Sequence, residues 1–220
     1  MTENRAYVQN LAQQYIEAGK PKEWFEQLYS QANNDNTAIP WAEMKPNHNL
    51  VQWLDHHNIQ SQEKTALTIG CGLGDDAEEL SQRGFKVTAF DISPSAIEWC
   101  KNRFPNSHVN YLVADLLNPP STWNQTFDFI LESYTLQALP PELSLPAISL
   151  IANFLAPDGT LLVICRGRNM EDQLDKVPYP LTKNDVMKFV DAGLSLVDFE
   201  DYLDYERSSS VRRFRVTFKK

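Results

Sequence analysis

The sequence predicts an α/β fold built on one doubly wound, mostly parallel sheet of seven strands. Two observations predict it: from residue 64 onward short apolar runs alternate with helix-like segments, and the connections between them are short. Such alternation is typical of parallel strands linked by crossover helices. A chain of 220 residues, 42% of them hydrophobic, can bury a substantial core within one domain. We expect residues 1–60 to form a helical cover within that domain and residues 61–220 to carry the sheet.

The individual elements are predicted from apolar periodicity and from residues that start or stop helices. Ser93-Pro94 and Thr182 are favourable helix starts, and Gly84 and Gly193 are favourable helix ends. The predicted strands cover residues 66–69, 86–90, 109–113, 127–131, 160–165, 196–202 and 211–218. The predicted helices cover residues 77–83, 95–103, 145–155 and 183–192, and amphipathic helical segments, broken at 19–21 and 33–37, fill residues 5–57.

Two turns complete the expected topology. The sequence APDG at 156–159 is expected to turn the chain into the strand at 160–165. The polar turn ERSSS at 206–210 is expected to join the last two strands as an antiparallel hairpin. This arrangement makes the last strand antiparallel and closes one edge of the sheet.

The charge and composition of the chain disfavour several classes of partner. A formal net charge of −9 disfavours nucleic acid, because such binding depends on clustered Lys and Arg. We interpret the late basic cluster of Arg212, Arg213 and Arg215, which alternates with Phe214 and Val216, as the solvated face of a strand. No apolar run suits a signal peptide or a membrane span, so we expect no membrane partner.

The three cysteines and four histidines show no metal-ligand spacing, so we expect no metal site. Cysteines this few and scattered also do not form a disulfide framework, which fits a reducing, cytoplasmic setting. Both a monomer and a homodimer are compatible with the sequence.

The stretch LTIGCGLGDD at 67–76 is the sharpest motif in the chain. Residues 72–77 match G-x-G-x-x-A, the fingerprint of a dinucleotide loop, but such a loop binds a diphosphate through the bare positive end of a helix. Asp75 and Asp76 occupy that first helical turn, where they suit the helix dipole and repel a diphosphate. The loop therefore favours a phosphate-free ligand with a positive centre. S-adenosylmethionine, with a sulfonium, an ammonium and one carboxylate, fits this description.

Three successive strands end in an acid, at the edge of the sheet where open α/β folds bind ligands. Asp91 ends the strand VTAFD and could accept both hydroxyls of a ribose. Asp115 ends YLVAD, where its side chain could accept from an adenine amino group while the backbone of Leu116 contacts the ring. Glu132 ends FDFILES and would face the same crevice. Each acid alone also has an ordinary interpretation, as a helix cap, a loop residue or a solvated side chain.

Taken together, these segments resemble the class I S-adenosylmethionine-dependent methyltransferases, whose domain has a Rossmann-like sheet. The matching segments, in the family's order and spacing between residues 64 and 220, are LTIGCGLGDD, VTAFDIS, VADLL, FDFILESYTLQALP and LAPDGTLLVICRGR. One position departs from the pattern: the family usually has an acid two residues before the first loop glycine, and this chain has Thr68. We expect Asp75 or Asp76 to take over part of that role. The resemblance implies cofactor contacts from Trp24, Trp41, Gly70, Cys71, Gly72, Gly74, Asp91, Ile92, Asp115, Leu116 and Glu132.

The N-terminal segment resembles the Trp-rich entry of thiol, thiopurine and halide methyltransferases, which act on small molecules. Its aromatic residues are Trp24, Phe25, Tyr29 and Trp41, and in those families such a segment folds over the cofactor. The alternative is a plain amphipathic helix that packs its aromatic side chains on the core. A thiolate or a phenolate needs little help from a base, which agrees with the absence of an obvious His–Asp pair in the sequence.

Candidate acceptor residues follow the fourth and fifth strands. Tyr134 is the predicted catalytic and substrate-facing side chain. Arg166, with Arg168, could hold an anionic group of the acceptor, and Arg166 could equally pair with a strand-end acid. The tripeptide NPP at 118–120 resembles the motif of amino-methylating enzymes, but Ser121 replaces the aromatic residue and the motif follows the third strand. We therefore interpret it as a turn.

The leading hypothesis is an S-adenosylmethionine-dependent methyltransferase acting on a small molecule, with a thiol or phenol-like acceptor as the first expectation. O- or N-methylation of a small acidic metabolite stays open. Two hypotheses from other classes are a nicotinamide-dependent oxidoreductase, supported by GLGDDA and Asp91 alone, and a cofactor-binding module without transfer activity, supported by Thr68 and the missing base.

Overall fold

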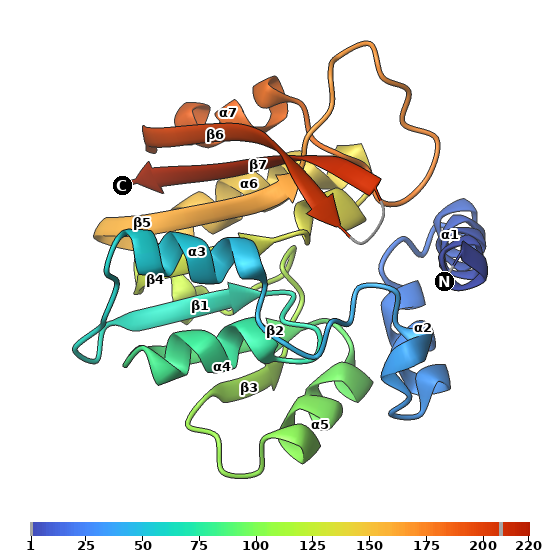
Figure 1. Cartoon of the computed structure of the whole chain (residues 1–220), viewed down its shortest axis with the longest axis horizontal. Helices are drawn as coiled ribbons and strands as arrows, with labels where there is room; N and C mark the ends of the chain where they lie inside the picture. Colours follow the sequence, from blue (N-terminus) through green and yellow to red (C-terminus); the bar gives the residue numbers. More distant parts are fainter. Residues whose placement is uncertain (1, 207–208) are drawn as a thin grey trace. The chain divides into compact units, whose positions relative to one another are not determined.

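The computed structural model describes residues 2–206 and 209–220 (Figure 1). Its strands are β1 (Thr65–Ile69), β2 (Lys86–Asp91), β3 (Asn110–Val113), β4 (Phe127–Ser133), β5 (Leu155–Arg166), β6 (Ser195–Glu206) and β7 (Ser209–Lys219). They form a seven-stranded sheet in the order β3-β2-β1-β4-β5-β7-β6, in which β7 is antiparallel to both neighbours. The predicted Rossmann-like, mostly parallel fold with an antiparallel last strand is therefore confirmed. Contacts within the chain divide it into two compact units, Met1–Glu63 with Gly70–Asp115 and Lys64–Ile69 with Leu116–Lys220.

The first unit combines most of the helices with β2 and β3. Its helices are α1 (Thr2–Glu17), α2 (Glu23–Ala32), the 3₁₀ turn η1 (Asn36–Ala38), α3 (His48–His56), α4 (Asp75–Gln82) and α5 (Pro94–Arg103). β2 and β3 run parallel, with Asp91 opposite Val113. α5 begins as predicted, because the Ser93 hydroxyl accepts from the Ala96 amide at 3.0 Å and Pro94 occupies the first turn. α2 packs against α1 and α5.

The second unit holds the other five strands. It also contains the 3₁₀ turns η2 (Ser121–Trp123) and η3 (Leu136–Ala138) and the helices α6 (Pro141–Phe154) and α7 (Lys183–Asp191). β1, β4 and β5 are parallel, with Glu132 opposite Ile69 on one side and Val163 on the other. The predicted apolar strand is the centre of this core, since the five residues from Leu161 to Cys165 have no exposed surface. α6 packs on β5 and α7 on β6, and the two helices contact each other (Figure 1).

The APDG segment departs from its prediction. β5 begins at Leu155, which pairs with Phe127, so 156–159 lies within the strand and is not a turn that precedes it. Pairing resumes between Phe129 and Thr160, and the extra residues form an irregularity in which Asp158 has a φ of 63°. A bulge of this kind absorbs surplus residues without ending the strand, which a pattern of turn residues does not reveal.

One further boundary differs from expectation. α6 begins at Pro141, four residues before the predicted start, because proline is well suited to the first helical turn. The predicted β6–β7 hairpin is confirmed. Its predicted turn at 206–210 includes residues 207 and 208, which lie outside the described residues.

None of the described helices is long and apolar enough to cross a membrane.

The interpretation of the β7 arginines as a solvated face is wrong. Arg213 is 1% exposed, and the side chains of Arg212 and Arg215 contact Asp201 and Glu200 on β6 at 2.7 and 2.6 Å. The alternation correctly predicts a strand, but acidic side chains of the neighbouring strand β6 pair with the arginines. The arginine side chains therefore form cross-strand ion pairs where contact with solvent is predicted.

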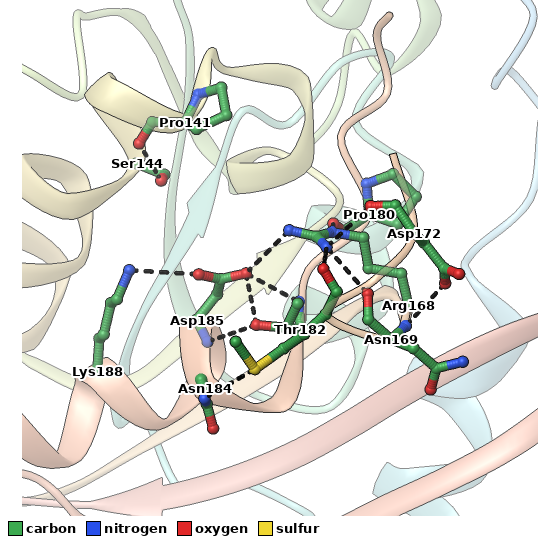
Figure 2. Close-up of polar contacts among 11 residues, drawn as sticks. Pro141, Ser144, Arg168, Asn169, Asp172, Pro180, Thr182, Asn184, Asp185 and Lys188 are labelled. Carbon is green, nitrogen blue, oxygen red and sulfur yellow. Dashed lines mark hydrogen bonds and ion pairs between the residues drawn. The ribbon is translucent and has the colours of Figure 1, made fainter. Parts of the chain in front are cut away.

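The loop that follows β5 is organised around Arg168 (Figure 2). Its ends meet at the Gly167–Leu181 bridge. The Arg168 guanidinium donates to the carbonyls of Pro180 and Asn169, both at 2.9 Å, and also to those of Met170 and Asp172. These donors are used to fold the loop, so the guanidinium serves the backbone of its own segment.

The loop leads into α7 through a capping box at Thr182 and Asp185 (Figure 2). The Asp185 amide donates to the Thr182 hydroxyl at 3.1 Å, and the Thr182 amide donates to the Asp185 carboxylate at 2.9 Å. Two amides that the helix itself leaves without partners are satisfied in this way. The predicted N-cap at Thr182 is therefore confirmed.

Replacing Thr182 with Ala is expected to lower the free energy of unfolding by about 1 kcal/mol, because the Asp185 amide loses its acceptor. The matched control is Thr182→Ser, which retains the hydroxyl. Urea unfolding followed by circular dichroism measures both variants. Equal midpoints for the Ala and Ser variants would show that the capping box does not stabilise α7.

Candidate functional site

The glycine loop between β1 and α4 is built on residues with left-handed backbone. Gly70, Gly72 and Gly74 have φ values of 57°, 54° and 89°. The Cys71 amide donates to the Phe90 carbonyl at 2.8 Å, which fastens the loop to β2. A side chain at Gly74 would lie 2.6 Å from the Tyr111 hydroxyl, so only glycine fits there. The glycines of LTIGCGLGDD therefore occupy positions where the backbone is left-handed.

The carboxylate of Asp91 joins the loop to the end of β2. Its Oδ2 accepts from the Gly72 amide and its Oδ1 from the Ser93 amide, each at 3.0 Å. Asp91 is 6% exposed, and burial, together with the nearby charge of Glu26, raises its pKa to about 6. The helix cap itself is Ser93, so Asp91 is not merely the cap of α5.

The two aspartates of the loop are placed in different surroundings at the start of α4. Asp75 is paired with both terminal nitrogens of Arg103, at 2.7 and 2.8 Å, and Arg103 also donates to the Leu73 carbonyl. Asp76 accepts from the Asn47 amide at 2.7 Å, and burial raises its pKa to about 6. Both carboxylates occupy the first helical turn, as predicted.

Asp115, which follows β3 closely, contacts a lysine from the N-terminal helices. Its Oδ2 accepts from Lys22 Nζ, and both side chains are 29% exposed. One helical turn further on, Glu26 accepts from the Ser93 hydroxyl at 2.6 Å and from the Ser95 hydroxyl at 2.7 Å. Lys22 and Glu26 therefore fasten the α2 segment to the ends of β2 and β3.

Neither Lys22 nor Glu26 was expected to take part in the site. Their spacing of four residues places them on one face of a helix, which is the only signal that the sequence carries. Their partners lie far along the chain, so no local pattern pairs them.

The aromatic residues of the N-terminal segment form a cluster whose Tyr29 lies beside the glycine loop. Trp41 Nε1 donates to the Tyr29 hydroxyl at 2.9 Å, and a side chain at Gly72 would come within 3.1 Å of that hydroxyl. Trp24 is completely buried, and its Nε1 has no hydrogen-bond partner among the described residues. Trp41 is 43% exposed and makes edge contacts with both other rings. The packing explains Trp24 as core, and the Tyr29 hydroxyl is the group of this cluster that lies beside Gly72.

Two further residues of the predicted cofactor set lie at the junctions of elements in the first unit. Ile92 is half-buried between β2 and α5. Cys71 contacts the thiol of Cys100, and this contact, with burial, raises the Cys71 pKa well above its ordinary value. Cys100 Sγ also lies 3.1 Å from the Gly72 carbonyl. Close packing, and not nucleophilic chemistry, is what these surroundings favour.

In the second unit, Glu132 is a wholly buried acid one residue before the end of β4. Its Oε1 accepts from the Leu136 amide at 2.8 Å, and its Oε2 has no hydrogen-bond partner among the described residues. Burial raises its pKa to about 7. Thr68, on the neighbouring β1, is 3% exposed and its hydroxyl also lacks a described partner. These two orphaned polar groups are costly unless a further group meets them.

The predicted acceptor residues follow β4 and β5 in the same unit. Tyr134 comes directly after β4 with a φ of 65°, and its ring lies beneath the Arg213 guanidinium. Arg166 is the last residue of β5, and its amide donates to Oε1 of Gln137 in η3 at 2.7 Å. Leu116 is buried at the start of the segment that follows β3. Among the described residues, no group of three or more His, Cys, Asp or Glu is placed to hold a metal ion.

Comparison with known proteins finds similarity to methyltransferases. A family model described as a methyltransferase domain matches residues 66–159. An uncharacterized methyltransferase of Mycobacterium tuberculosis is 32% identical over 98 residues, which are 44% of this chain and 48% of that protein. The chain therefore spans about half the length of the curated relatives that it matches.

Two solved structures share the fold at low sequence identity. The N-methyltransferase NodS from Bradyrhizobium japonicum, in complex with S-adenosylhomocysteine, is 20% identical, with a TM-score of 0.69 over 90% of this chain and 97% of that one. The 1,6-didemethyltoxoflavin N1-methyltransferase from Burkholderia thailandensis, with 1,6-didemethyltoxoflavin and S-adenosylhomocysteine bound, is 18% identical, with a TM-score of 0.70 over 94% of this chain and 89% of that one. The family model, the relatives and the shared fold therefore agree in their similarity to methyltransferases.

Proposed function

We propose that the chain binds S-adenosylmethionine and transfers its methyl group to a small molecule. The observation that carries the proposal is the Asp91 carboxylate, which is fixed by the Gly72 and Ser93 amides at the end of β2. A carboxylate held beside a glycine loop suits the paired hydroxyls of a ribose. The family model covers this region, and the two solved neighbours are described with S-adenosylhomocysteine bound.

The residues of the first unit fit this cofactor on physical grounds. Asp76 and Asp91 keep a pKa of about 6, so both are largely ionised at neutral pH and favour a ligand with positive charge. Asp115 follows the neighbouring strand β3. An amino group of the cofactor could replace Lys22 as the donor to its carboxylate. Tyr29 and Trp41 form the aromatic cover beside Gly72. Aromatic faces attract cations, which suits a sulfonium.

When bound, this cofactor supplies an activated methyl group on a positively charged sulfur. Asp91, Asp115 and the cover of Tyr29 and Trp41 would hold this cofactor. The chemistry it would supply is in-line transfer of the methyl group to the acceptor atom, with the bonding pair left on sulfur and any acceptor proton passed to a base or water. What the chain supplies is alignment and exclusion of water, which can account for much of the rate. We assign the positioning of the acceptor to Tyr134, and the contact with an anionic group of the acceptor to Arg166.

The acceptor class is the finer part of the proposal. A thiol or phenol-like acceptor agrees with the aromatic cover, and the sequence offers no obvious His–Asp pair to serve as a base. O- or N-methylation of a small acidic metabolite is the second candidate, and the observation that favours it is the position of Arg166 at the end of β5. 1,6-Didemethyltoxoflavin in the Burkholderia structure is a small molecule, which supports a small acceptor in general.

Two measurements test the proposal. Calorimetry with S-adenosylhomocysteine comes first: binding at micromolar ligand supports it, whereas heats no larger than dilution at millimolar ligand would refute it. Methyl transfer from labelled cofactor to a panel of thiols, phenols and carboxylic acids then identifies the acceptor. Cofactor binding without transfer to any of a broad panel would favour the module without transfer activity. NADH binding in a fluorescence titration would instead favour the oxidoreductase.

Replacing Asp91 with Asn is expected to weaken S-adenosylhomocysteine binding about tenfold or more, because an amide offers one acceptor where the carboxylate offers two charged ones. Calorimetry gives the dissociation constants. The control is Asp158→Asn, a change of the same chemistry at an exposed position. An Asp91→Asn variant that melts normally and binds as tightly as the control would contradict the assignment of Asp91.

The pH dependence of stability is expected to report on Glu132. Its folded pKa, about 7, exceeds the ordinary 4.5, so the folded state holds a proton that the unfolded state releases between these values. Its contribution is therefore fully present below pH 4.5 and is lost as the pH rises toward 7. The loss amounts to about 3 kcal/mol. Because Glu132→Gln keeps the shape and cannot ionise, this variant should gain stability relative to wild type over that window.

Urea unfolding of both proteins at pH 5 and pH 7.5 measures this difference. Asp76 and Asp91 titrate in the same range in both proteins and cancel in the comparison. If the stability difference between Glu132→Gln and wild type is the same at the two pH values, Glu132 does not have the raised pKa.

A further inference from the structure

The backbone at Tyr134 is unusual for its residue type. Its φ of 65° lies in the left-handed region, which a bulky side chain seldom adopts. Its amide still donates to the Ile164 carbonyl at 3.0 Å, so the residue remains tied to β5 as the chain leaves β4. Such strain persists only where surrounding contacts determine the conformation, and it is often found at functional sites.

One of those contacts is the guanidinium of Arg213. Its central carbon lies 5.0 Å from the centroid of the Tyr134 ring, within the range of a cation–π interaction. Arg213 is 1% exposed, so the interaction is not weakened by water as it would be on a surface. Removing a guanidinium from water is costly, and a hydrophobic side chain of similar size would fill the same space. A buried arginine at this point therefore calls for a specific role.

Asp204 fixes the other side of the guanidinium. It lies on β6, two residues beyond Tyr202, which is directly opposite Arg213, so both side chains point to the same face of the sheet. Arg213 Nε donates to Asp204 Oδ2 at 3.4 Å. The guanidinium is thus placed between an acid on the hairpin and the tyrosine ring at the end of β4.

The other two arginines of β7 are used differently. The central guanidinium carbon of Arg212 lies 5.2 Å from the centroid of the Phe214 ring, and that of Arg215 lies 5.6 Å from the centroid of the Tyr202 ring. Both arginines therefore contact rings of their own hairpin. Each is also paired twice with one carboxylate, Arg212 with Asp201 and Arg215 with Glu200. Arg213 differs because it reaches a ring at a parallel strand end, where the acceptor site is proposed.

We propose that Arg213 is a positioning residue that holds the Tyr134 ring in place at the carboxyl end of β4, with Asp204 as its anchor. The planar guanidinium stacks on the ring and restricts its rotation, which a point charge on a flexible chain would do less well. Its relevance to catalysis rests on the proposed function, in which Tyr134 positions the methyl acceptor. The positioning itself does not depend on which acceptor is used.

Fluorine NMR of protein labelled with 3-fluorotyrosine tests the positioning without any acceptor. The chain has 8 tyrosines, and Tyr134→Phe identifies the resonance of interest. In Arg213→Met that resonance should narrow and move toward the value of a free fluorotyrosine, because the ring gains freedom. Arg213→Lys should give an intermediate result, and Arg215→Met, the matched control on the same strand, should leave it unchanged. A Tyr134 line in Arg213→Met as broad as in the control would overturn the proposal.

Asp204→Asn provides a second variant should Arg213→Met fail to fold. It retains the arginine and loosens its anchor, so the Tyr134 line should narrow in the same direction by a smaller amount. An unchanged line in Asp204→Asn, with Arg213→Lys also unchanged, would likewise overturn the proposal.

Kinetics with an acceptor found in the panel connects the positioning to transfer. Arg213→Met should lower kcat about tenfold, the order expected for a desolvated cation–π contact, while the dissociation constant of S-adenosylhomocysteine stays within twofold of wild type. Arg215→Met should change neither quantity. If Arg213→Met and Arg215→Met have the same kcat, Arg213 does not contribute to methyl transfer. Failure of wild type to transfer methyl groups would instead refute the proposed function and leave the NMR result standing.

Discussion

The buried carboxylate of Asp91 is the interaction on which the proposed cofactor site depends. By accepting from the Gly72 and Ser93 amides, one side chain joins the glycine loop, the end of β2 and the start of α5. Each of these amides is a donor that would otherwise be left without a partner near a buried turn. The carboxylate thus stabilises the loop conformation before any ligand arrives. A ligand that meets it encounters a charge that is already oriented, so little conformational freedom is lost on binding.

The electrostatic argument from the two loop aspartates becomes more specific once their partners are known. Asp75 is paired twice with Arg103, so much of its charge is compensated within the protein. Asp76 has a backbone partner and a pKa near 6, and it supplies the negative charge that a diphosphate would meet at neutral pH. The first turn of α4 is therefore occupied by acids, but the repulsion expected of both comes mainly from one. A phosphate-free cofactor remains the better match for this loop.

Sequence reasoning succeeded where the cause of a structure is local. Ser93 and Thr182 as caps, the loop glycines and the buried strand before Arg166 follow from short-range rules that tertiary packing does not override here. It failed where the cause is a distant partner. Arg213 shows why: a period of two predicts which residues share a face of the sheet, but not whether the neighbouring strand covers that face. The fastening of α2 through Lys22 and Glu26 was missed for the same reason.

The same distinction explains why side chains at strand ends are easier to place from the sequence than contacts between distant segments. Cofactor contacts follow the ends of strands, so they can be placed once the strands are known. The proposed acceptor part depends on how side chains from β6, β7 and the segment after β4 meet, as they do at Tyr134, Asp204 and Arg213. Here the fold tolerates both a strained backbone and a buried cation, each of which lowers stability when considered alone. The two costs are reduced together, because the guanidinium that needs a partner in the interior is also a group that can keep the tyrosine in its strained conformation. Stability alone does not account for this pairing, whereas the role proposed for Tyr134 does.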